Sequence, residues 1–321
     1  MCLICRLVQK LTTNEIVSKS HFHMSLRSII HNLKFNRWNL AFVEESLDGI
    51  LQSKSVKVNY MKGNNRKQWF ADPFILDVTP EHIICLVEEL SYKTMRGRIA
   101  KLVIDRKTYK LLETKILLDL PTHLSFPFIL RKDGNVYVLP ENSASGCSTI
   151  YSYNSTDDSL TPYNVIARRP FTDATIFCED NKAYLLTTQR PNQNGNVLDI
   201  YWFDTERFTI SKEPIQTVSF DNKRARNAGE IFKSSGKAYR PAQDCNGGYG
   251  KGVILQELKI TDGEFVFKDY CSFYPNSWVY HMGYHTFNSY KGLTVLDAHG
   301  YRFVLLGRFL EALSSIARKF L

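Results

Sequence analysis

A unit of strand–turn–strand character recurs five times along this chain, and that repeat limits its fold more than any other feature. With Asp72, Phe126, Asp173, Ala228 and Tyr284 aligned, the copies follow at steps of 54, 47, 55 and 56 residues. A period of about 50 residues is typical of propeller blades. The first strands of the copies read ADPFIL (71–76), SFPFIL (125–130), TDATIF (172–177), NAGEIF (227–232) and YHTFNS (284–289).

Each first strand turns within a few residues into a second strand. The turns contain Asp133-Gly134, Asp180-Asn181 and Ser235-Gly236, residue types that tolerate hairpin geometry. In the first four copies two more strands follow, for example 98–105 and 111–118, and four antiparallel strands in about 50 residues make one blade. The second strands read HIICLVEE (82–89), NVYVLPEN (135–142), KAYLLTTQ (182–189), KAYRPAQD (237–244) and GLTVLDAH (292–299).

The fifth copy lacks its outer strands, and two strand-like segments, WNLAFVEE (38–45) and SVKVNY (55–60), are left over near the N-terminus. If these segments complete the fifth blade, the ring closes and exposes no sheet edge. The sequence therefore predicts an all-β, five-bladed β-propeller of four-stranded antiparallel blades over 38–305. A β-sandwich is the rival all-β fold, but it does not repeat a four-stranded unit five times.

The two ends of the chain are predicted to lie outside the propeller. Residues 1–37 are expected to be a leader that is partly disordered or helical. Residues 306–321 are expected to form an amphipathic helix that packs on the propeller or binds a membrane surface or a partner. Its apolar positions are Phe309, Leu310, Leu313, Ile316, Ala317 and Leu321, with Arg308, Arg318 and Lys319 beside them.

Charge and cysteine content narrow the choice of partners and compartment. The net charge of +9 would favour an anionic lipid, a membrane surface or a sugar phosphate. The basic residues are spread along the chain without a nucleic-acid-binding motif, so no nucleic acid partner is predicted. Seven Cys without a framework spacing favour reduced thiols, and no signal peptide is recognisable, which indicates a cytoplasmic protein. Neither a metal nor another cofactor is predicted, and the oligomeric state is not indicated.

Polar residues recur in phase with the repeat where the inner strands approach the ring axis. Asp72 and Asp173 occupy equivalent positions, and Glu230 lies two residues beyond the equivalent position, on the same side of its strand. Two or three converging carboxylates are the minimum for glycosyl chemistry, which needs one protonated acid and one ionised carboxylate. Alternatively, these residues cap strand starts and accept bonds from backbone amides. Further residues expected at the axis are Glu88, Glu89, Glu141, His285, Asp297 and His299.

The segment 240–250, RPAQDCNGGYG, is the densest polar stretch of the chain. Arg240 could bind a carboxylate, a phosphate or a sugar hydroxyl, and Gln243 and Asp244 could hold hydroxyl pairs, with Tyr249 beside them. A plain turn with a structural Arg–Asp pair is the alternative. Arg224 and Arg226 add positive charge nearby.

These motifs resemble the N-terminal domain of plant glucosamine inositolphosphorylceramide transferases and its stand-alone bacterial relatives. The similarity covers roughly 38–305, and its most specific part is RPAQDC…YG. More distantly, the repeat resembles the five-bladed propellers of glycoside hydrolase families 43 and 32. The family 43 pattern implies a general base at Asp72, an orienting carboxylate at Asp173 and an acid at Glu230. Those hydrolases carry their acid at the position of Ala228, however, and a slip of two residues moves a carboxylate by about 6–7 Å along a strand.

Three hypotheses for the function follow. The first, which we favour, is an enzyme of glycosyl transfer or glycosidic-bond cleavage in surface-glycan or glycolipid biosynthesis, acting on a glycan or nucleotide sugar. The second is a carbohydrate-binding accessory module for a separate glycosyltransferase, because the plant proteins carry such a domain further along their chain. The third is a protein-interaction propeller, which would not need a carboxylate-rich axis.

Overall fold

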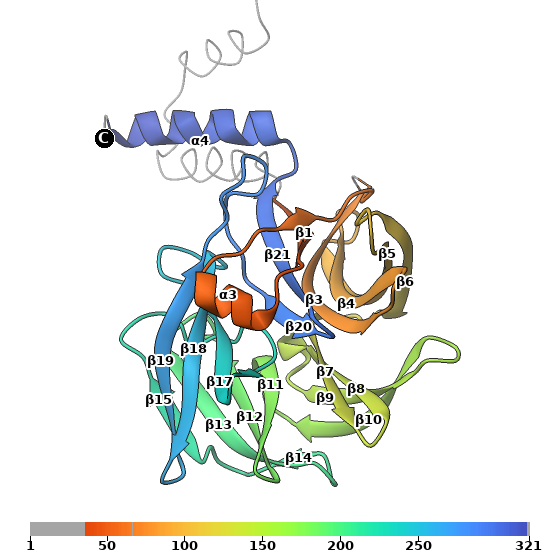
Figure 1. Cartoon of the computed structure of the whole chain (residues 1–321), viewed down its shortest axis with the longest axis vertical. Helices are drawn as coiled ribbons and strands as arrows, with labels where there is room; N and C mark the ends of the chain where they lie inside the picture. The colour runs from red at the N-terminus through yellow and green to blue at the C-terminus, as the bar shows by residue number, and fades with distance from the viewer. Residues whose placement is uncertain (1–35, 66, 320–321) are drawn as a thin grey trace, which may run out of the picture. The chain divides into compact units, whose positions relative to one another are not determined.

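The structure, a computed structural model, describes residues 36–65 and 67–319. The chain divides into two compact units, one of residues 37–300 and one that contains the C-terminal helix. The predicted leader, residues 1–37, lies almost wholly outside the described residues. The first unit is the five-bladed propeller predicted from the repeat, and Figure 1 shows its sheets around a common centre.

Four of the blades are built from consecutive strands. Blade one is β3 (Gln68–Val78), β4 (His82–Ser91), β5 (Arg96–Asp105) and β6 (Leu111–Leu118). Blade two is β7 (Ser125–Lys132), β8 (Asn135–Glu141), β9 (Ser148–Asn154) and β10 (Ser159–Ala167), with the short helix η1 (Ser143–Ser145). Blade three is β11 (Phe171–Glu179), β12 (Lys182–Gln189), β13 (Val197–Asp204), β14 (Thr209–Ile210) and β15 (Gln216–Ser219). Blade four is β16 (Phe232–Ser234), β17 (Lys237–Asp244), β18 (Gly252–Thr261) and β19 (Glu264–Phe273).

The fifth blade joins both ends of the propeller, as predicted. Its strand order is β20 (Phe287–Tyr290), β21 (Leu293–Tyr301), β1 (Asn36–Val43) and β2 (Asn59–Tyr60). Between β1 and β2 lies a helix that the sequence did not lead us to expect, α3 (Leu47–Ser53). The side chain of Ser46 caps this helix by accepting a hydrogen bond from the backbone N–H of Gly49, as an N-cap serine does.

The innermost strands carry a distortion at the repeated position. Asp72, Phe126 and Asp173 have φ angles of 49°, 43° and 48°, and the register with the second strand shifts at each of them. These are β-bulges, which re-aim side chains and are common beside functional sites. The bulges therefore recur with the sequence repeat and turn Asp72 and Asp173 out of the regular alternation.

In blades four and five the first strands begin later than predicted. NAGEIF and YHTFNS were expected to be strands, but β16 starts at Phe232 and β20 at Phe287. The residues before them form other bonds: the N–H of Phe287 donates to the carbonyl of Ala228 in the neighbouring blade, and the N–H of Ala228 donates to the carbonyl of Pro241 within blade four. Gly229, with a φ of 152°, allows the approach, since a Cβ there would lie 2.1 Å from the carbonyl oxygen of Phe287.

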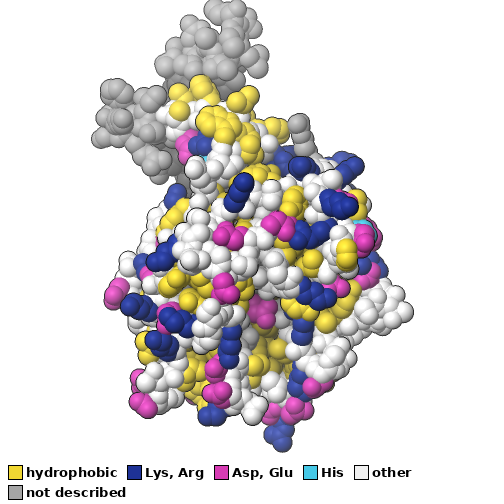
Figure 2. All heavy atoms as spheres, viewed as in Figure 1, with side chains coloured by type: hydrophobic (Ala, Val, Ile, Leu, Met, Phe, Trp, Pro, Cys, Tyr) yellow, Lys and Arg dark blue, Asp and Glu magenta, His cyan; other side chains and the backbone are white. Residues whose placement is uncertain are grey.

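The hydrophobic core lies between adjacent blades. In one cluster, Phe42 and Val295 of blade five pack with Phe70 and Val87 of blade one, and all four are fully buried or nearly so. This cluster joins the N-terminal strand β1 to the blade that follows it in the ring. On the face seen in Figure 2, Lys and Arg side chains are interspersed with Asp and Glu over the propeller.

The second unit contains the helix α4 (Val304–Lys319), which starts two residues earlier than predicted. Within it, Leu305 and Phe309 are 79% and 60% exposed. The expected packing of this helix on the propeller stays a prediction. Among the described residues, no helix combines the length and the hydropathy needed to cross a membrane.

Ring closure by β1 predicts a large effect of truncating its core residue. The substitution Phe42→Ala removes a fully buried ring between two blades and should lower the free energy of unfolding by about 3–5 kcal/mol. Urea denaturation measures this change. The control Leu112→Ala, on the exposed side of β6, should change it by no more than about 0.5 kcal/mol. Equal effects of the two substitutions would contradict the closure.

Candidate functional site

Polar side chains from several blades meet at one end of the ring axis, where the bulges lie. The carboxylate of Asp72 accepts a hydrogen bond from the N–H of Phe126 at 3.1 Å, and the N–H of Asp72 donates to Asp297 Oδ2 at 2.9 Å. These two bonds connect blade five to blade one and blade one to blade two. We call the residues gathered here the axial cluster: Asp72, Glu88, His123, Asp173, Arg226, Gln243, Tyr249, His285 and Asp297.

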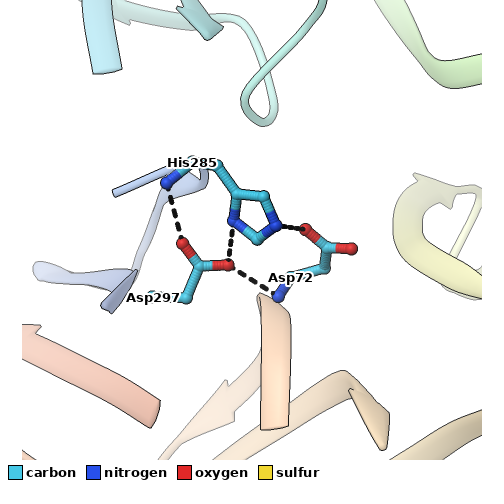
Figure 3. Close-up of side chains that lie close together, drawn as sticks. All are labelled: Asp72, His285 and Asp297. Atoms are coloured by element: carbon cyan, nitrogen blue, oxygen red, sulfur yellow. Dashed lines mark hydrogen bonds and ion pairs between the residues drawn. The ribbon is translucent and has the colours of Figure 1, made fainter. Parts of the chain in front are cut away.

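Asp72, His285 and Asp297 form the buried centre of the axial cluster (Figure 3). His285 Nδ1 lies 2.5 Å from Asp297 Oδ2, and His285 Nε2 lies 3.5 Å from Asp72 Oδ1, so the imidazole ring stands between the two carboxylates. Asp297 Oδ1 also accepts hydrogen bonds from the backbone N–H groups of His285 and Thr286, each at 3.0 Å. The Thr286 hydroxyl lies 2.9 Å from both carboxylates. A buried carboxylate needs such partners.

The charges of this centre are set by its own members. Although burial lowers it, the pKa of His285 is raised to about 9 by the charges of Asp297 and Asp72. Burial would raise the pKa of Asp297, but the protonated His285 holds it below its usual range. Burial, followed by the charge of His285, lowers the pKa of His299 to about 3. At neutral pH the centre therefore holds a cationic His285 and a neutral His299, both stacked with Trp38, at 3.9 and 4.3 Å between ring centroids.

Asp72, His285 and Asp297 could also hold a metal ion, because their ligand atoms lie within 4.8 Å of one another. Among residues 36–65 and 67–319 they are the one such group of His, Cys, Asp or Glu side chains. Their donor set, two carboxylates and an imidazole, is chemically suitable. However, Asp297 Oδ2 already accepts from Asp72 N–H and contacts His285 Nδ1. An ion would have to displace these bonds, and the prediction of a metal-free site stays a prediction.

Asp173 forms the second half of the axial cluster. Its Oδ2 accepts hydrogen bonds from Arg226 Nε at 2.6 Å and from Gln243 Nε2 at 3.0 Å. Its Oδ1 is buried and has no hydrogen-bond partner within the described part of the chain, and the same holds for Gln243 Oε1. Burial raises the pKa of Asp173 to about 6 although Arg226 opposes the shift. Because no described residue donates to these two buried acceptors, a ligand could donate hydrogen bonds to them.

Tyr249 is the aromatic residue that links the two halves of the axial cluster. Its ring lies 5.3 Å from the ring of His285 and 4.9 Å from the guanidinium of Arg226, and it is 45% exposed. The Gly-rich loop that follows β17 positions it, and Gly250, with a φ of 61°, packs against Trp38 and His285. A large ring that contacts the buried His285 and the partly buried Arg226 and still faces solvent is suited to contact a ligand.

His123 is a member of the axial cluster that the sequence analysis missed, because it stands alone in the linker after blade one. Its Nδ1 accepts the N–H of Gly97 at 3.0 Å, which leaves the proton on Nε2, 3.1 Å from Glu88 Oε1. Gly97 is needed here, since a Cβ would lie 2.4 Å from the carbonyl of Leu124 and 2.7 Å from Glu88. Burial raises the pKa of Glu88 to about 7, although His123 opposes the shift.

Two further expected carboxylates have partners within their own blades, and Glu141 also lies close enough to His123, Asp173 and Arg226 for its charge to act on them. Glu88 and Glu89 point to opposite faces of β4, and Glu89 is fully buried in an ion pair with Arg98 at 2.9 Å. Glu141 accepts hydrogen bonds from the hydroxyl of Ser125 and the N–H of Ser143, at 3.0 and 3.2 Å.

Arg240 and Asp244 are placed inside blade four. The guanidinium of Arg240 is fully buried and donates to Asn227 Oδ1 at 2.9 Å and to Gln256 Oε1 at 2.6 Å. Asp244 accepts from the hydroxyl of Tyr274 at 2.7 Å. Their position does not fit the expected substrate contact, and they do not form the Arg–Asp pair of the alternative interpretation, because each has other partners.

Glu230 also stands apart from Asp72 and Asp173. Its N–H donates to Asn288 Oδ1 at 2.7 Å, and burial raises its pKa to about 7 against the opposing charge of Arg131. Arg131 in turn donates to the carbonyls of Ile75 and Leu76, beyond Asp72 along β3. The expected set of three catalytic carboxylates is therefore not gathered in the axial cluster, because an offset of two residues carries Glu230 further along the axis.

Comparison with known proteins places this site in a family. The family model described as "Glucosamine inositolphosphorylceramide transferase 1, N-terminal" matches residues 54–269. The chain belongs to this family. It is 30% identical over 205 residues to glucosamine inositolphosphorylceramide transferase 1 of Arabidopsis thaliana, which covers 61% of this chain and 26% of the relative. The namesake of Oryza sativa subsp. japonica is 27% identical over 212 residues, with coverage of 64% and 28%.

This member of the transferase N-terminal family thus spans about a quarter of the length of those plant relatives. Solved structures with a similar fold include a family 43 β-xylosidase/α-arabinofuranosidase from a compost metagenome, in complex with xylotriose. It is 13% identical in sequence with a TM-score of 0.51, and the match covers 72% of this chain and 86% of that one. The family 43 enzyme of Xanthomonas citri with xylose matches at 10% identity and 0.52, over 78% and 91%. These neighbours show that the fold is shared, and the family match makes this a carbohydrate-related propeller.

The charge of His285 predicts a pH dependence of stability. The pKa of His285 is raised from 6.5 to about 9 in the folded protein. The contribution of its positive charge to the free energy of unfolding is therefore fully present below about pH 6.5 and is lost as the pH rises through about 9. The difference in free energy of unfolding between wild type and His285→Gln should therefore shrink between pH 6.5 and pH 9.5. Chemical denaturation at both pH values measures it.

The control is His82→Gln, at the start of β4 and away from the axial cluster. Its difference from wild type should be the same at the two pH values. A His285 difference that stays constant or grows with pH would show that the imidazole is neutral.

Proposed function

We propose that the axial cluster binds a carbohydrate and that this binding is the domain's contribution to glycosyl transfer, as an accessory module. The observation that carries the proposal is the exposed ring of Tyr249 beside a buried carboxylate, Asp173, whose Oδ1 accepts no hydrogen bond from any described residue. The names of the curated relatives support it, since they are transferases of glucosamine and this chain corresponds to only a quarter of their length.

The chemistry of the cluster suits a sugar ring. A sugar ring has C–H faces, which can lie against the Tyr249 ring, and hydroxyl groups at its edge. A hydroxyl can donate to Asp173 Oδ1 and accept from Arg226, whose Nη1 bonds Asn194 Oδ1 at 2.7 Å and is thereby held in place. Because Asp72, Asp173 and His285 are fixed by their own bonds, the site is organised before the ligand arrives.

Glycosidic-bond chemistry is the second candidate, and one observation favours it. Glu88, with a pKa of about 7, lies close enough to Asp72 for the two charges to interact. Burial raises the pKa of Asp72 as well, and a buried carboxyl group that keeps its proton is the acid that glycosidic-bond cleavage needs. The position of Glu230 beside Arg131 argues against the catalytic set inferred from the hydrolase pattern. In this candidate Glu88 would supply the proton instead.

The cytoplasmic location, the role in surface-glycan or glycolipid biosynthesis and the contact with anionic lipid stay predictions. Exclusion of nucleic acid is likewise untested, although the mixed charges of the face in Figure 2 agree with it.

Substitution of Tyr249 tests the proposal, because it removes an exposed ring and leaves the hydrogen bonds of Asp72, Asp173 and Asp297 in place. Thermal unfolding of the wild type is measured with nucleotide sugars and neutral glycan fragments. A ligand at 100 times its dissociation constant stabilises the folded state by about 2.7 kcal/mol, a shift of several degrees. The shift should be lost in Tyr249→Ala, because the ring is the exposed wall of the site.

The matched control is Tyr163→Ala, a tyrosine of similar exposure, 51%, on the outer strand β10. It should keep the full ligand-induced shift. Stabilisation that survives in Tyr249→Ala, or no stabilisation by any sugar, would overturn the proposal for the axial cluster. Release of free sugar from an oligosaccharide by the wild type, and its absence in Glu88→Gln, would favour the second candidate.

A further inference from the structure

The hairpin-turn end of the propeller contains a hollow that the axial cluster does not use. Its volume is about 650 Å³, within the range of small-molecule sites. It lies between blades one and two, at the opposite ends of the inner strands from the bulges. Turn or strand-end residues of four hairpins line it, among them Asp77, Asp133, Asp158 and Lys291.

The wall of this inter-blade hollow is held in place by its own contacts. The guanidinium of Arg131 lies 3.7 Å from the centroid of the Tyr290 ring and donates to two backbone carbonyls of β3. Asp158 accepts from both Lys101 and the hydroxyl of Tyr153. These groups need no rearrangement to meet a ligand, which limits the entropic cost of binding.

The charges of the hollow argue against an anionic ligand. Lys101 pairs with Asp158, Lys132 with Asp133 at 2.9 Å, and Lys291 with Asp77 at 2.6 Å. The fourth cation, Arg131, is held by the Tyr290 ring and by the carbonyls of Ile75 and Leu76. The three lysines thus already have carboxylate partners and Arg131 has its own acceptors, so a phosphate would have to compete with groups already in place.

The remaining surface is amphipathic. Leu76, Ile84 and Val136 supply apolar wall, and the paired lysines and aspartates supply donors and acceptors side by side. A neutral ligand with C–H faces and hydroxyl edges matches both properties at once. An apolar ligand would remove water from these charged pairs and give them no hydrogen bond in return, which is costly.

We propose that this inter-blade hollow is a second binding site, for a neutral oligosaccharide, at the opposite end of the propeller from the axial cluster. The two sites share no residue. The inference goes beyond the proposed function, because it holds whether or not the axial cluster binds a sugar. A domain with both sites would hold a glycan at two points and gain affinity without new contacts at either.

Hydrogen–deuterium exchange on the whole chain localises the site without any substitution. The probes are xylotriose, cellotriose and maltotriose at millimolar concentration, with inorganic diphosphate as the anionic comparison. At least one trisaccharide should slow exchange in the segments 131–136 and 153–158. Diphosphate should not. Protection of these segments by diphosphate alone, or by none of the probes, would overturn the proposal.

Calorimetric titration of variants provides the second measurement. Asp158→Ala should weaken binding of the protecting trisaccharide at least tenfold. The control, Glu257→Ala, removes a lysine-paired carboxylate from the smaller hollow of about 280 Å³ between blades three and four and should stay within twofold of wild type. Wild-type affinity in Asp158→Ala would overturn the proposal.

Tyr249→Ala separates the two sites. It should remove protection from residues 245–250 and leave that of 131–136 intact. Protection of 131–136 without any at 245–250 in the wild type would overturn the proposal for the axial cluster and support the second site. Protection of 245–250 alone would overturn the second site and support the axial cluster.

Discussion

The arrangement of the propeller's axis depends on the hydrogen bonds and the ion pair of the Asp297 carboxylate. This carboxylate accepts hydrogen bonds from the backbone N–H groups of Asp72, His285 and Thr286 and pairs with the imidazole of His285. Asp297 is fully buried, so it is stable as an anion only while these partners stay in place. Its bond to Asp72 holds the bulge of blade one, and Asp72 in turn receives the N–H of Phe126 from blade two. These bonds hold the seam between the first and last blades, whereas the pairing of β1 with β21 closes the ring within blade five.

Asparagine side chains make comparable links elsewhere around the ring. Asn288 of blade five donates to the carbonyl of Pro73 in blade one and accepts the N–H of Glu230 in blade four. Asn227 donates to the carbonyl of Asp173. These side chains supply partners for backbone groups that the strand ladders leave out, namely the carbonyls of Pro73 and Asp173 at the bulges and the N–H of Glu230 before the short strand β16. The polar residues at the axis are thus partly structural, which is the alternative that the sequence analysis left open for Asp72 and Asp173.

The two ends of the ring offer different chemistry. One end gathers buried carboxylates, two cations and an exposed tyrosine, whereas the other is formed by hairpin turns and inter-blade hollows with paired charges. A fold shared with family 43 hydrolases at 10–13% identity does not decide which end works or how. The hydrolase pattern is interrupted where Ala228 replaces the expected acid, and the nearest glutamate of that segment, Glu230, interacts with Arg131 instead.

The sequence by itself determined the ring: a unit repeated five times with hairpin turns in phase cannot bury its faces except against its own copies, and the unpaired N-terminal segments had to complete the last blade. It also placed Asp72 and Asp173 at equivalent positions, and the bulges are found at both. Tertiary structure alone decided which polar residues share a site. His123 has no motif around it and reaches Glu88 only because the linker after blade one folds over Gly97. Arg240 was predicted to bind a ligand, but its guanidinium is buried and donates hydrogen bonds to Asn227 and Gln256. An offset of two residues along the strand separates Glu230 from Asp72. These contacts join residues that are far apart in the chain, and a local sequence pattern does not predict the distances between such residues.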